Sequence, residues 1–372
     1  MAEALKTFFS TELVRRLAAD MARVEPSFPA RAFVRDATAD LDTLELLDRG
    51  KQIARALRTH LPKEYPHALD AILRSLGPEH ATDELVGVGM APFYYLPHTL
   101  FVAEHGLDHF ELSMRAQYEL TKRFSAESSI RPYIARDPER TFAQLLDWTR
   151  DENAHVRRLV SEGTRLRLPW ASRVAWLDAN PARVLELLEV LKDDPATVVR
   201  RSVANNLNDL SKDHAELVIQ TCRRWSKGAS PEMHGLVRHA LRSLVKKGHR
   251  GALGVLGVGE RAEIDISRVR LSPKPVRLGG ELRFSFTLGS LATRAQKLVV
   301  DFAIHFVKAN GALRPKVFKL EQLTLAAGCA AQLEGKVSFA AMTTRRHYAG
   351  RHRIEVLVNG TVHPLAEFDV RA

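Results

Sequence analysis

The sequence predicts a protein with α and β domains, in which an α-solenoid of stacked helix pairs is followed by an immunoglobulin-like β-sandwich. Two observations support this prediction. A short helical pattern recurs around Arg123, Arg158, Arg201 and Arg238, at spacings of 35, 43 and 37 residues, and such a period is typical of helix-pair repeats. Beyond residue 255 the apolar residues change to alternating spacing, which is the period of a β-strand. We therefore expect a helical domain at 1–255 and a sandwich at 256–372.

The two best-preserved repeats align without a gap, from 137 to 158 and from 180 to 201. Both copies open on a polar residue followed by proline, Asp137-Pro138 and Asn180-Pro181, which is a common helix start. Each repeat is therefore predicted to consist of a helix that begins with proline, a short turn containing Asp, and a second helix.

The second helix of each repeat places polar side chains on one face. Arg158, Glu162 and Arg165 lie at i, i+4 and i+7, and residues at this spacing share one side of a helix. The following repeats have the same spacing in Arg201, Asn205 and Asp209, and in Arg238, Arg242 and Lys246. Stacked repeats would align these residues into a basic surface that is interrupted by Glu127, Glu162 and Asp209. A single Arg and Glu four residues apart usually form only a solvated ion pair. Because the pattern recurs in successive repeats, we interpret it as a functional surface.

The charge of the chain indicates a polyanionic partner. The formal net charge is +11, and clustered Lys and Arg gain free energy by releasing the counterions of phosphates. Residues 261–372 hold 18 Lys and Arg against 9 Asp and Glu, so most of the excess lies in the predicted sandwich. The helical domain must therefore gather its basic groups on one face.

The remaining composition bounds the class of protein. Cys222 and Cys329 lie far apart in the sequence, which argues against a disulfide framework and favours a reducing compartment. No run of eighteen apolar residues occurs, so we expect no membrane partner. We also expect the protein to be cytoplasmic and a monomer. His105 and His109 are four residues apart but lack a well-placed third ligand, so we expect no metal and no cofactor.

The region before the repeats is predicted to be helical. Apolar residues at helical spacing indicate two helices within 11–61, separated by Pro26 and Pro29, and a further helix at 65–76. The aromatic run at 90–97 is interpreted as core packing, as are Trp148 and Trp176. The basic loop at 165–170 ends in Trp170, whose ring would either cap the core or lie against a sugar or a cationic ring.

The last third of the chain reads as a series of strands. Expected strands cover residues 264–269, 282–286, 298–307, 316–320, 337–339, 354–358 and 368–370, and this number of strands suits an immunoglobulin-like sandwich. Asn359-Gly360 predicts a hairpin turn. Basic loops at 308–319 and 343–347 are either polyanion contacts or a means of keeping the protein in solution.

Six stretches of the chain resemble the AlkC branch of the DNA alkylation-repair glycosylases. They are AESSIRPY (126–133), VRRLVSEG (156–163), RLRLPW (165–170), SVANNLND (202–209), VKANG (307–311) and PKVFKL (315–320). Their order along the chain makes the resemblance specific, although residues 1–80 share only general helical character with the family.

The resemblance implies HEAT-like repeats that hold double-stranded DNA and an immunoglobulin-like domain that closes around it. It also implies hydrolysis of the N-glycosidic bond of cationic N3-alkylated bases, such as 3-methyladenine and 3-methylcytosine. The resemblance further implies that these bases are reached without base flipping, in contrast to the usual glycosylase strategy of extruding the nucleotide into a pocket.

The residues on the repeat face suit this chemistry. We expect Glu162 and Asp209 to stabilise positive charge on the deoxyribose and to activate water, with assistance from Glu127. Trp170 is expected to contact the lesion nucleotide. The predicted DNA-binding residues are Arg123, Arg158, Arg165, Arg201, Asn205, Arg238, Arg242, Lys308, Lys316, Lys319, Arg345 and Arg346. The alternative is a non-enzymatic DNA-binding or scaffold protein, and the presence of all three carboxylates favours the enzyme.

Overall fold

The computed structural model describes residues 5–84, 89–258, 262–341 and 346–372. It confirms the predicted fold class, because a helical region is followed by a domain of two β-sheets. The chain divides into two compact units, Met1–Leu210 and Ser211–Ala372. The change from helix to strand falls between Val255 and Ile264, so the last helices belong to the same compact unit as the sandwich.

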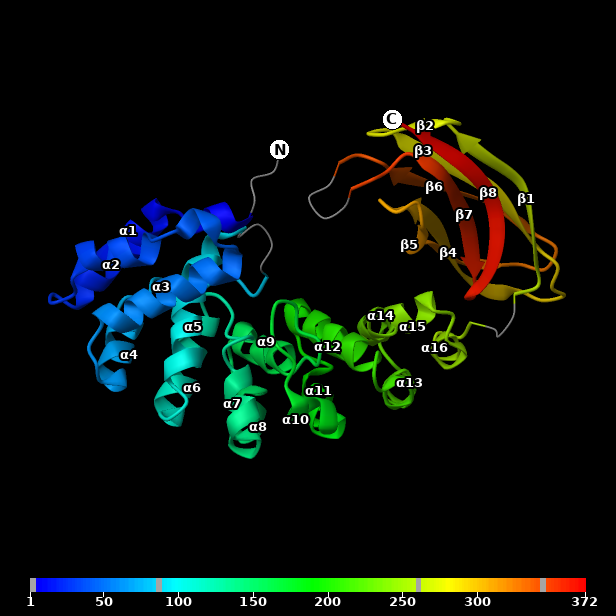
Figure 1. Cartoon of the computed structure of the whole chain (residues 1–372). Helices are drawn as coiled ribbons and strands as arrows, with labels where there is room; N and C mark the ends of the chain where they lie inside the picture. Colours follow the sequence, from blue (N-terminus) through cyan, green and yellow to red (C-terminus); the bar gives the residue numbers. More distant parts are fainter. Residues whose placement is uncertain (1–4, 85–88, 259–261, 342–345) are drawn as a thin grey trace. The chain divides into compact units, whose positions relative to one another are not determined.

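Within its described residues the first unit contains helices and no strands (Figure 1). Its α-helices are α1 (Thr11–Val24), α2 (Ala30–Thr38), α3 (Leu46–His60), α4 (Tyr65–Arg74), α5 (Leu96–His105), α6 (Phe110–Thr121), α7 (Arg131–Arg136), α8 (Pro138–Trp148), α9 (Ala154–Gly163), α10 (Ala175–Ala179), α11 (Pro181–Leu191) and α12 (Thr197–Leu210). Short 3-10 helices lie at Leu5–Phe8, Leu41–Thr43 and Ala91–Tyr95. None of the helices in the described part of the chain is both long and apolar enough to span a bilayer.

The predicted repeat pair is present as α8–α9 and α11–α12. Both first helices begin at the expected prolines, Pro138 and Pro181, and the Asp137 side chain accepts a hydrogen bond from the Arg140 backbone N–H at 3.2 Å. Helix α9 packs against both helices of the following repeat, so the second helices of the two repeats lie side by side.

In both repeats the recurring arginine follows a second one, as Arg157-Arg158 and Arg200-Arg201. The first arginine of each of these two pairs stabilises the turn between the two helices of its repeat. The Arg157 guanidinium donates to the Asp151 carbonyl at 2.8 Å and to the Asp194 carboxylate of the next turn at 2.6 Å. One repeat later, the Arg200 guanidinium donates to the Asp194 carbonyl at 2.5 Å. These arginines are structural, and only the second arginine of each pair remains for the other face of the helix.

The region before the repeats contains two α-helices more than predicted, α2 and α5. Helix α2 lies between α1 and α3, where the sequence suggested only a break at Pro26 and Pro29. Its apolar face is small, because Phe33 and Ala37 are its buried residues, and two residues do not establish a helical period. The aromatic run is only partly core, since Tyr94 is buried while Phe93 is half-buried. Trp148 is buried, as predicted.

The second unit combines the last helices with the sandwich. Its helices are α13 (Ala215–Trp225), α14 (Pro231–Ala240), α15 (Arg242–Lys246) and α16 (Arg250–Val255). Its strands are β1 (Ile264–Ser272), β2 (Val276–Arg277), β3 (Glu281–Ser290), β4 (Gln296–Val307), β5 (Leu313–Leu325), β6 (Ala330–Ser338), β7 (Gly350–Val358) and β8 (Thr361–Arg371).

The strands form a three-stranded sheet in the order β1-β3-β6 and a five-stranded sheet in the order β2-β8-β7-β4-β5. Neighbours pair antiparallel, except for the short parallel pair β2–β8. All seven predicted strands are present, and β2 is an addition. The core between the sheets is apolar and aromatic, with Phe284 of one sheet 4.8 Å from Phe302 of the other, measured between ring centroids.

Alternate residues of β4 face away from this core, yet they are also buried. Val299 and Asp301 are 6% and 5% exposed, because residues of α14, α15 and α16 lie over this side of the sheet and line two cavities with it. The outer face of β4 is therefore a contact surface for helices, and the helices and the sandwich pack as one body.

The turn between β7 and β8 fixes this packing. Asn359 and Gly360 have φ angles of 49° and 77°, as the predicted Asn-Gly hairpin turn requires. The Gly360 backbone lies directly against the Gly248 backbone between α15 and α16, so that a Cβ atom on Gly360 would overlap the Gly248 Cα.

We predict that Gly360→Ala destabilises the second unit by at least about 2 kcal/mol, since it adds a backbone clash to the strain of a non-glycine residue at positive φ. The measurement is urea unfolding of the full chain. Gly311→Ala is a matched control, because Gly311 also has a φ of 77° but has open space around its Cα. Equal losses of stability in the two variants would contradict the proposed contact.

Candidate active site

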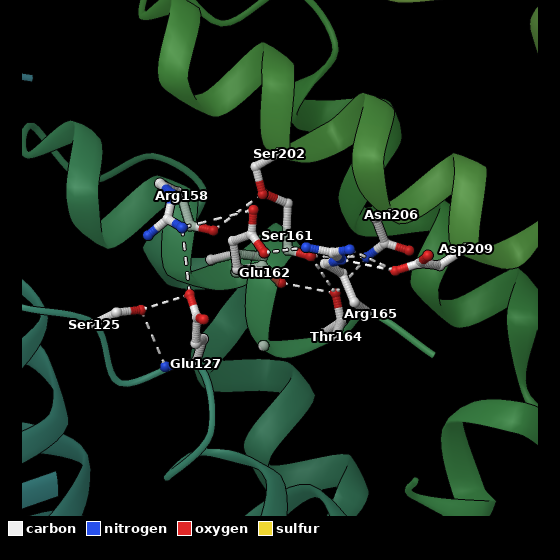
Figure 2. Close-up of polar contacts among 12 residues, drawn as sticks. Ser125, Glu127, Arg158, Ser161, Glu162, Thr164, Arg165, Ser202, Asn206 and Asp209 are labelled. Atoms are coloured by element: carbon white, nitrogen blue, oxygen red, sulfur yellow. Dashed lines mark hydrogen bonds and ion pairs between the residues drawn. The ribbon is translucent and has the colours of Figure 1, made fainter. Parts of the chain in front are cut away.

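The three carboxylates that the sequence singled out come together in the first unit (Figure 2). Arg165 lies between two of them. Its guanidinium donates to a Glu162 carboxylate oxygen at 2.8 Å through Nη1 and to the Asp209 Oδ2 at 2.8 Å through Nε. Because Glu162 lies in the last turn of α9 and Asp209 in the last turn of α12, this arginine joins the second helices of two successive repeats.

A second arginine extends the same arrangement to the preceding repeat. The Arg158 Nη2 lies 3.3 Å from a Glu127 carboxylate oxygen and 3.6 Å from Glu162. The Ser125 hydroxyl donates to Glu127 at 2.8 Å. Carboxylate and guanidinium groups therefore alternate across three segments of the chain, and we call these five charged residues the charge chain: Glu127, Arg158, Glu162, Arg165 and Asp209.

The charge chain is largely withdrawn from water. Glu162 and Asp209 are only 4% and 3% exposed, and a buried carboxylate is unstable unless it is paired and hydrogen-bonded. Burial opposes the charge of Arg165, but its two carboxylate partners outweigh burial and raise the pKa of the guanidinium. With three acids and two bases, the charge chain has a formal excess of one negative charge.

Hydrogen bonds between uncharged groups hold α9 and α12 together next to the charge chain. The Ser161 and Ser202 hydroxyls are 2.6 Å apart across the α9–α12 contact. The Asn206 amide donates to the Ser161 carbonyl at 2.8 Å and to the Thr164 hydroxyl at 3.1 Å. Buried polar networks of this kind limit the relative movement of the helices, and therefore of the carboxylates at their ends.

Glycine at the end of α9 allows the preceding repeat to approach. A Cβ atom on Gly163 would lie 2.6 Å from the Ile130 side chain and 3.7 Å from the Glu127 carbonyl oxygen. A larger residue would push away the segment that bears Glu127. Gly163 therefore contributes to the site through the space that it leaves.

Trp170 lies in the loop that follows α9 and is not part of the core. Its side chain is 63% exposed, and its φ of 63° is unusual for a residue with a Cβ. Backbone strain of this kind is found at functional sites, where the surrounding structure maintains it. The Phe93 ring supports the indole edge-on, with 6.4 Å between the ring centroids. The structure thus excludes the interpretation that Trp170 caps the core.

Arg131 fastens both ends of the Trp170 loop, and the sequence analysis missed this role. Its guanidinium donates to the carbonyls of Gly163 at 2.9 Å, Arg165 at 2.8 Å and Ser172 at 3.0 Å. Burial lowers the pKa of Arg131 to about 10, so the side chain still carries its charge at neutral pH. No pattern in the sequence marks this residue, because its partners are backbone carbonyls that lie about 30 to 40 residues away.

A cavity of about 280 Å³ opens beside the charge chain. Its wall contains the Glu127 carboxylate and the rings of Phe93, Phe124 and Trp170. His80 also lines it, and burial lowers the pKa of this imidazole. Since the unperturbed value is already below 7, His80 is neutral at pH 7 and adds no positive charge to the wall.

The predicted DNA-binding residues are divided between the two compact units, and those of the first unit have different environments. Arg123 donates to the Gly77 carbonyl at 2.6 Å and to the Glu119 carboxylate at 2.9 Å, so its side chain is used inside the protein. Arg158 and Arg165 belong to the charge chain. Arg201 is exposed and Asn205 is half-buried on α12.

The remaining predicted DNA-binding residues belong to the second unit. Arg238 of α14 and Lys319 of β5 are exposed, while Arg242 and Lys308 are half-buried. Lys316 lies over the Phe318 ring at 5.2 Å, and Arg346 over the Tyr348 ring at 5.7 Å. Arg345 lies outside the described residues.

We predict that Arg131→Gln loosens the Trp170 loop and lowers the free energy of unfolding by about 3 kcal/mol, because it leaves buried carbonyls without donors. Trypsin should then cleave at 165–167 faster than in the wild type. Arg136→Gln is the control, since it removes the same charge from the same helix at an exposed position. Cleavage at the wild-type rate in Arg131→Gln would show that the loop does not depend on this residue.

Comparison with known proteins identifies the family. Residues 123–243 match the family model described as DNA alkylation repair enzyme, and residues 265–372 match the C-terminal Ig-like domain of the uncharacterised protein YhaZ. The chain is 36% identical to the protein YhaZ of Bacillus subtilis (strain 168), over 98% of this chain and 99% of that protein. The structure of the Pseudomonas fluorescens alkylpurine DNA glycosylase AlkC, bound to DNA containing an abasic site analog, matches with a TM-score of 0.90, 39% identity and full coverage of both chains. The chain belongs to the AlkC-type family of DNA alkylation-repair glycosylases.

Proposed function

We propose that the chain hydrolyses the N-glycosidic bond of cationic N3-alkylated bases, such as 3-methyladenine and 3-methylcytosine, in double-stranded DNA. One observation carries this proposal beyond the family assignment. The charge chain brings three carboxylates from successive repeats into one array that two arginines hold in place. The family membership and the titled activity of the Pseudomonas fluorescens relative support the reaction class.

The chemistry of the substrate explains why carboxylates suffice. An N3-alkylated base already carries a positive charge, so the bond from the sugar C1′ to the base breaks without a proton donor. The electron pair of that bond stays with the base and neutralises it, and positive charge develops on the deoxyribose. Water then adds to C1′ and gives its proton to a carboxylate. A site with excess negative charge favours the transition state of this step over the neutral product.

Within this mechanism Glu162 and Asp209 stabilise the sugar cation and orient the water, and Glu127 assists. Fixed charges are effective here because they need no reorganisation when the cation forms. The Arg158 and Arg165 guanidinium groups pair with the acids and hold them in place. Trp170 contacts the lesion nucleotide, since its ring is exposed at the rim of the cavity beside Glu127.

The competing function is a DNA-binding scaffold without catalysis. A protein that only bound phosphates would gain nothing from placing carboxylates on its binding face, because they repel the phosphates. Here Glu162 and Asp209 are buried at the cost of desolvation, and this arrangement supports a role in stabilising a cation.

We predict that Asp209→Asn and Glu162→Gln each slow base release by about a hundredfold, the usual loss when one charge-stabilising group is removed. The measurement is chromatography of bases released from methylated duplex DNA in single turnover. Glu152→Gln, which changes an exposed carboxylate just before α9, should release bases at the wild-type rate. Release at the wild-type rate by both active-site variants would contradict the roles proposed for these acids, and no release by the wild type would favour the scaffold.

We also propose that the damaged base stays stacked in the duplex while its N-glycosidic bond is cleaved. In that case selectivity comes from the positive charge and the labile bond of the lesion, and no pocket has to enclose the base. The alternative is that the base flips out of the duplex into the cavity beside Glu127, because the volume and the aromatic walls of this cavity would admit a nucleobase.

A fluorescent base analogue next to the lesion distinguishes the two modes. We expect little increase in its emission on binding, because a stacked base remains quenched. A large increase, of the size produced by a flipping glycosylase, would contradict the stacked mode and leave the glycosylase assignment intact. Phe93→Ala then tests the cavity directly, since loss of base release in that variant together with the large increase would place the base against the aromatic wall.

A further inference from the structure

The three carboxylates of the charge chain are carried by two different kinds of backbone. Glu162 and Asp209 lie in the last turns of α9 and α12, where the backbone hydrogen bonds of a helix fix their positions. The repeat pattern aligns Glu127 with Glu162, yet Glu127 lies in a turn between α6 and α7. We call residues 126–130 the Glu127 turn. Contacts other than those of a helix must therefore hold this carboxylate in place.

The backbone of the Glu127 turn supplies little of this support. The Ile130 N–H donates to the Ala126 carbonyl at 3.0 Å and closes the turn. A single hydrogen-bonded turn is unstable by itself, because it orders several residues for one bond. The position of Glu127 therefore depends on side chains that bind the turn from outside.

Two side chains of α6 bind the turn. The Thr121 hydroxyl accepts a hydrogen bond from the Ala126 N–H at 3.3 Å. Gln117 lies one helical turn earlier on the same face of α6, and its Oε1 accepts from the Ser129 hydroxyl at 3.2 Å. The same hydroxyl donates to the Ala126 carbonyl at 3.1 Å. Both backbone groups of the residue just before Glu127 are thus bound by side chains.

These polar side chains are buried. Gln117, Thr121 and Ser129 are 0%, 1% and 2% exposed. Burial of an amide or a hydroxyl costs free energy unless the group is hydrogen-bonded, and apolar residues would fill the same space without that cost. The contacts with the Glu127 turn therefore account for polar residues at these buried positions.

The other side of the Glu127 turn lies against α9. The Ile130 side chain fills the space that Gly163 leaves, since a Cβ atom on Gly163 would lie 2.6 Å from it. Arg158 of α9 contacts the Glu127 carboxylate at 3.3 Å. The turn is thus held between α6 and α9, and a shift of about 1 Å, which is enough to impair catalysis, would disturb the contact with Arg158.

We propose that Thr121 and Ser129 are positioning residues for Glu127, an inference that rests on the proposed function. Both act through the backbone of Ala126 and so set the direction in which the Glu127 side chain leaves the turn. Gln117 completes the arrangement, because it orients the Ser129 hydroxyl. In this repeat, side chains perform the task that helix backbone performs for Glu162 and Asp209.

The test compares variants that differ in one hydroxyl. Thr121→Val keeps the shape of the side chain and should slow single-turnover base release at saturating DNA by about tenfold, the equivalent of one hydrogen bond. Thr121→Ser keeps the hydroxyl and should release bases at close to the wild-type rate. Thr141→Val is the control, because it removes an equally buried hydroxyl that bonds within α8. DNA affinity, and its slope on a plot of log affinity against log salt concentration, should stay unchanged, since no charge is removed.

A double-mutant cycle shows whether the loss passes through Glu127. Glu127→Ala alone should slow base release, and the addition of Thr121→Val should slow it no further, because a positioning residue has no effect once the group that it positions is gone. The same fold loss with and without the Glu127 carboxylate would overturn the proposal. So would a Thr121→Ser variant as slow as Thr121→Val.

Hydrogen exchange provides a readout that does not depend on catalysis. Amides in residues 124–131 should exchange faster in Thr121→Val and in Ser129→Ala than in the wild type, and Ser129→Ala adds no atoms that could disturb folding. Wild-type exchange and wild-type base release in both variants would overturn the positioning role alone. Absence of base release by the wild type would overturn the proposed function and this role with it.

Discussion

Two guanidinium groups that hold three carboxylates are the arrangement on which the rest of the site depends. Glu162 and Asp209 are almost fully buried, and a buried carboxylate without a partner destabilises the fold. An arginine suits this task better than a lysine, because its planar fork donates to two acceptors in fixed directions. Arg165 uses this geometry to join the last turns of α9 and α12. This pairing fixes the positions of both acids, which the proposed stabilisation of a cation requires.

The repeat architecture explains how such an arrangement is built. Each Arg-Arg pair divides its work, since the first arginine fixes the turn of its repeat and the second lies on the opposite side of the helix. Arg157 and Arg200 illustrate the first role and Arg158 the second. Stacking one helical repeat on the next then brings residues that are about forty positions apart in the sequence to one surface. Gly163 and the Ser161–Ser202 contact set the spacing between repeats closely enough for the charges to meet.

Much of this structure could be predicted from the sequence. The features that could not be predicted depend on contacts between residues that are distant in the sequence. The helix starts at Pro138 and Pro181 and the Asn359-Gly360 turn depend on neighbouring residues, so the sequence is sufficient to place them. The carboxylate face followed from helical spacing. By contrast, the Gly77 carbonyl that Arg123 contacts and the carbonyls that Arg131 contacts lie far away in the sequence, and such contacts leave no trace in a pattern of side chains. The association of α13–α16 with the sandwich was missed for the same reason, since the buried outer face of β4 is apparent only once the helices cover it.

The central claim is that Arg165 acts on the carboxylates and not on a phosphate, and one variant tests it most directly. Arg165→Gln should reduce single-turnover base release at saturating DNA by about a hundredfold, while the salt slope of DNA binding stays at the wild-type value. Arg165→Lys should not restore the rate, because one ammonium group cannot reproduce the two-pronged contact. A release rate at the wild-type value, together with a salt slope lower by about one, would instead identify Arg165 as a phosphate contact and contradict the account.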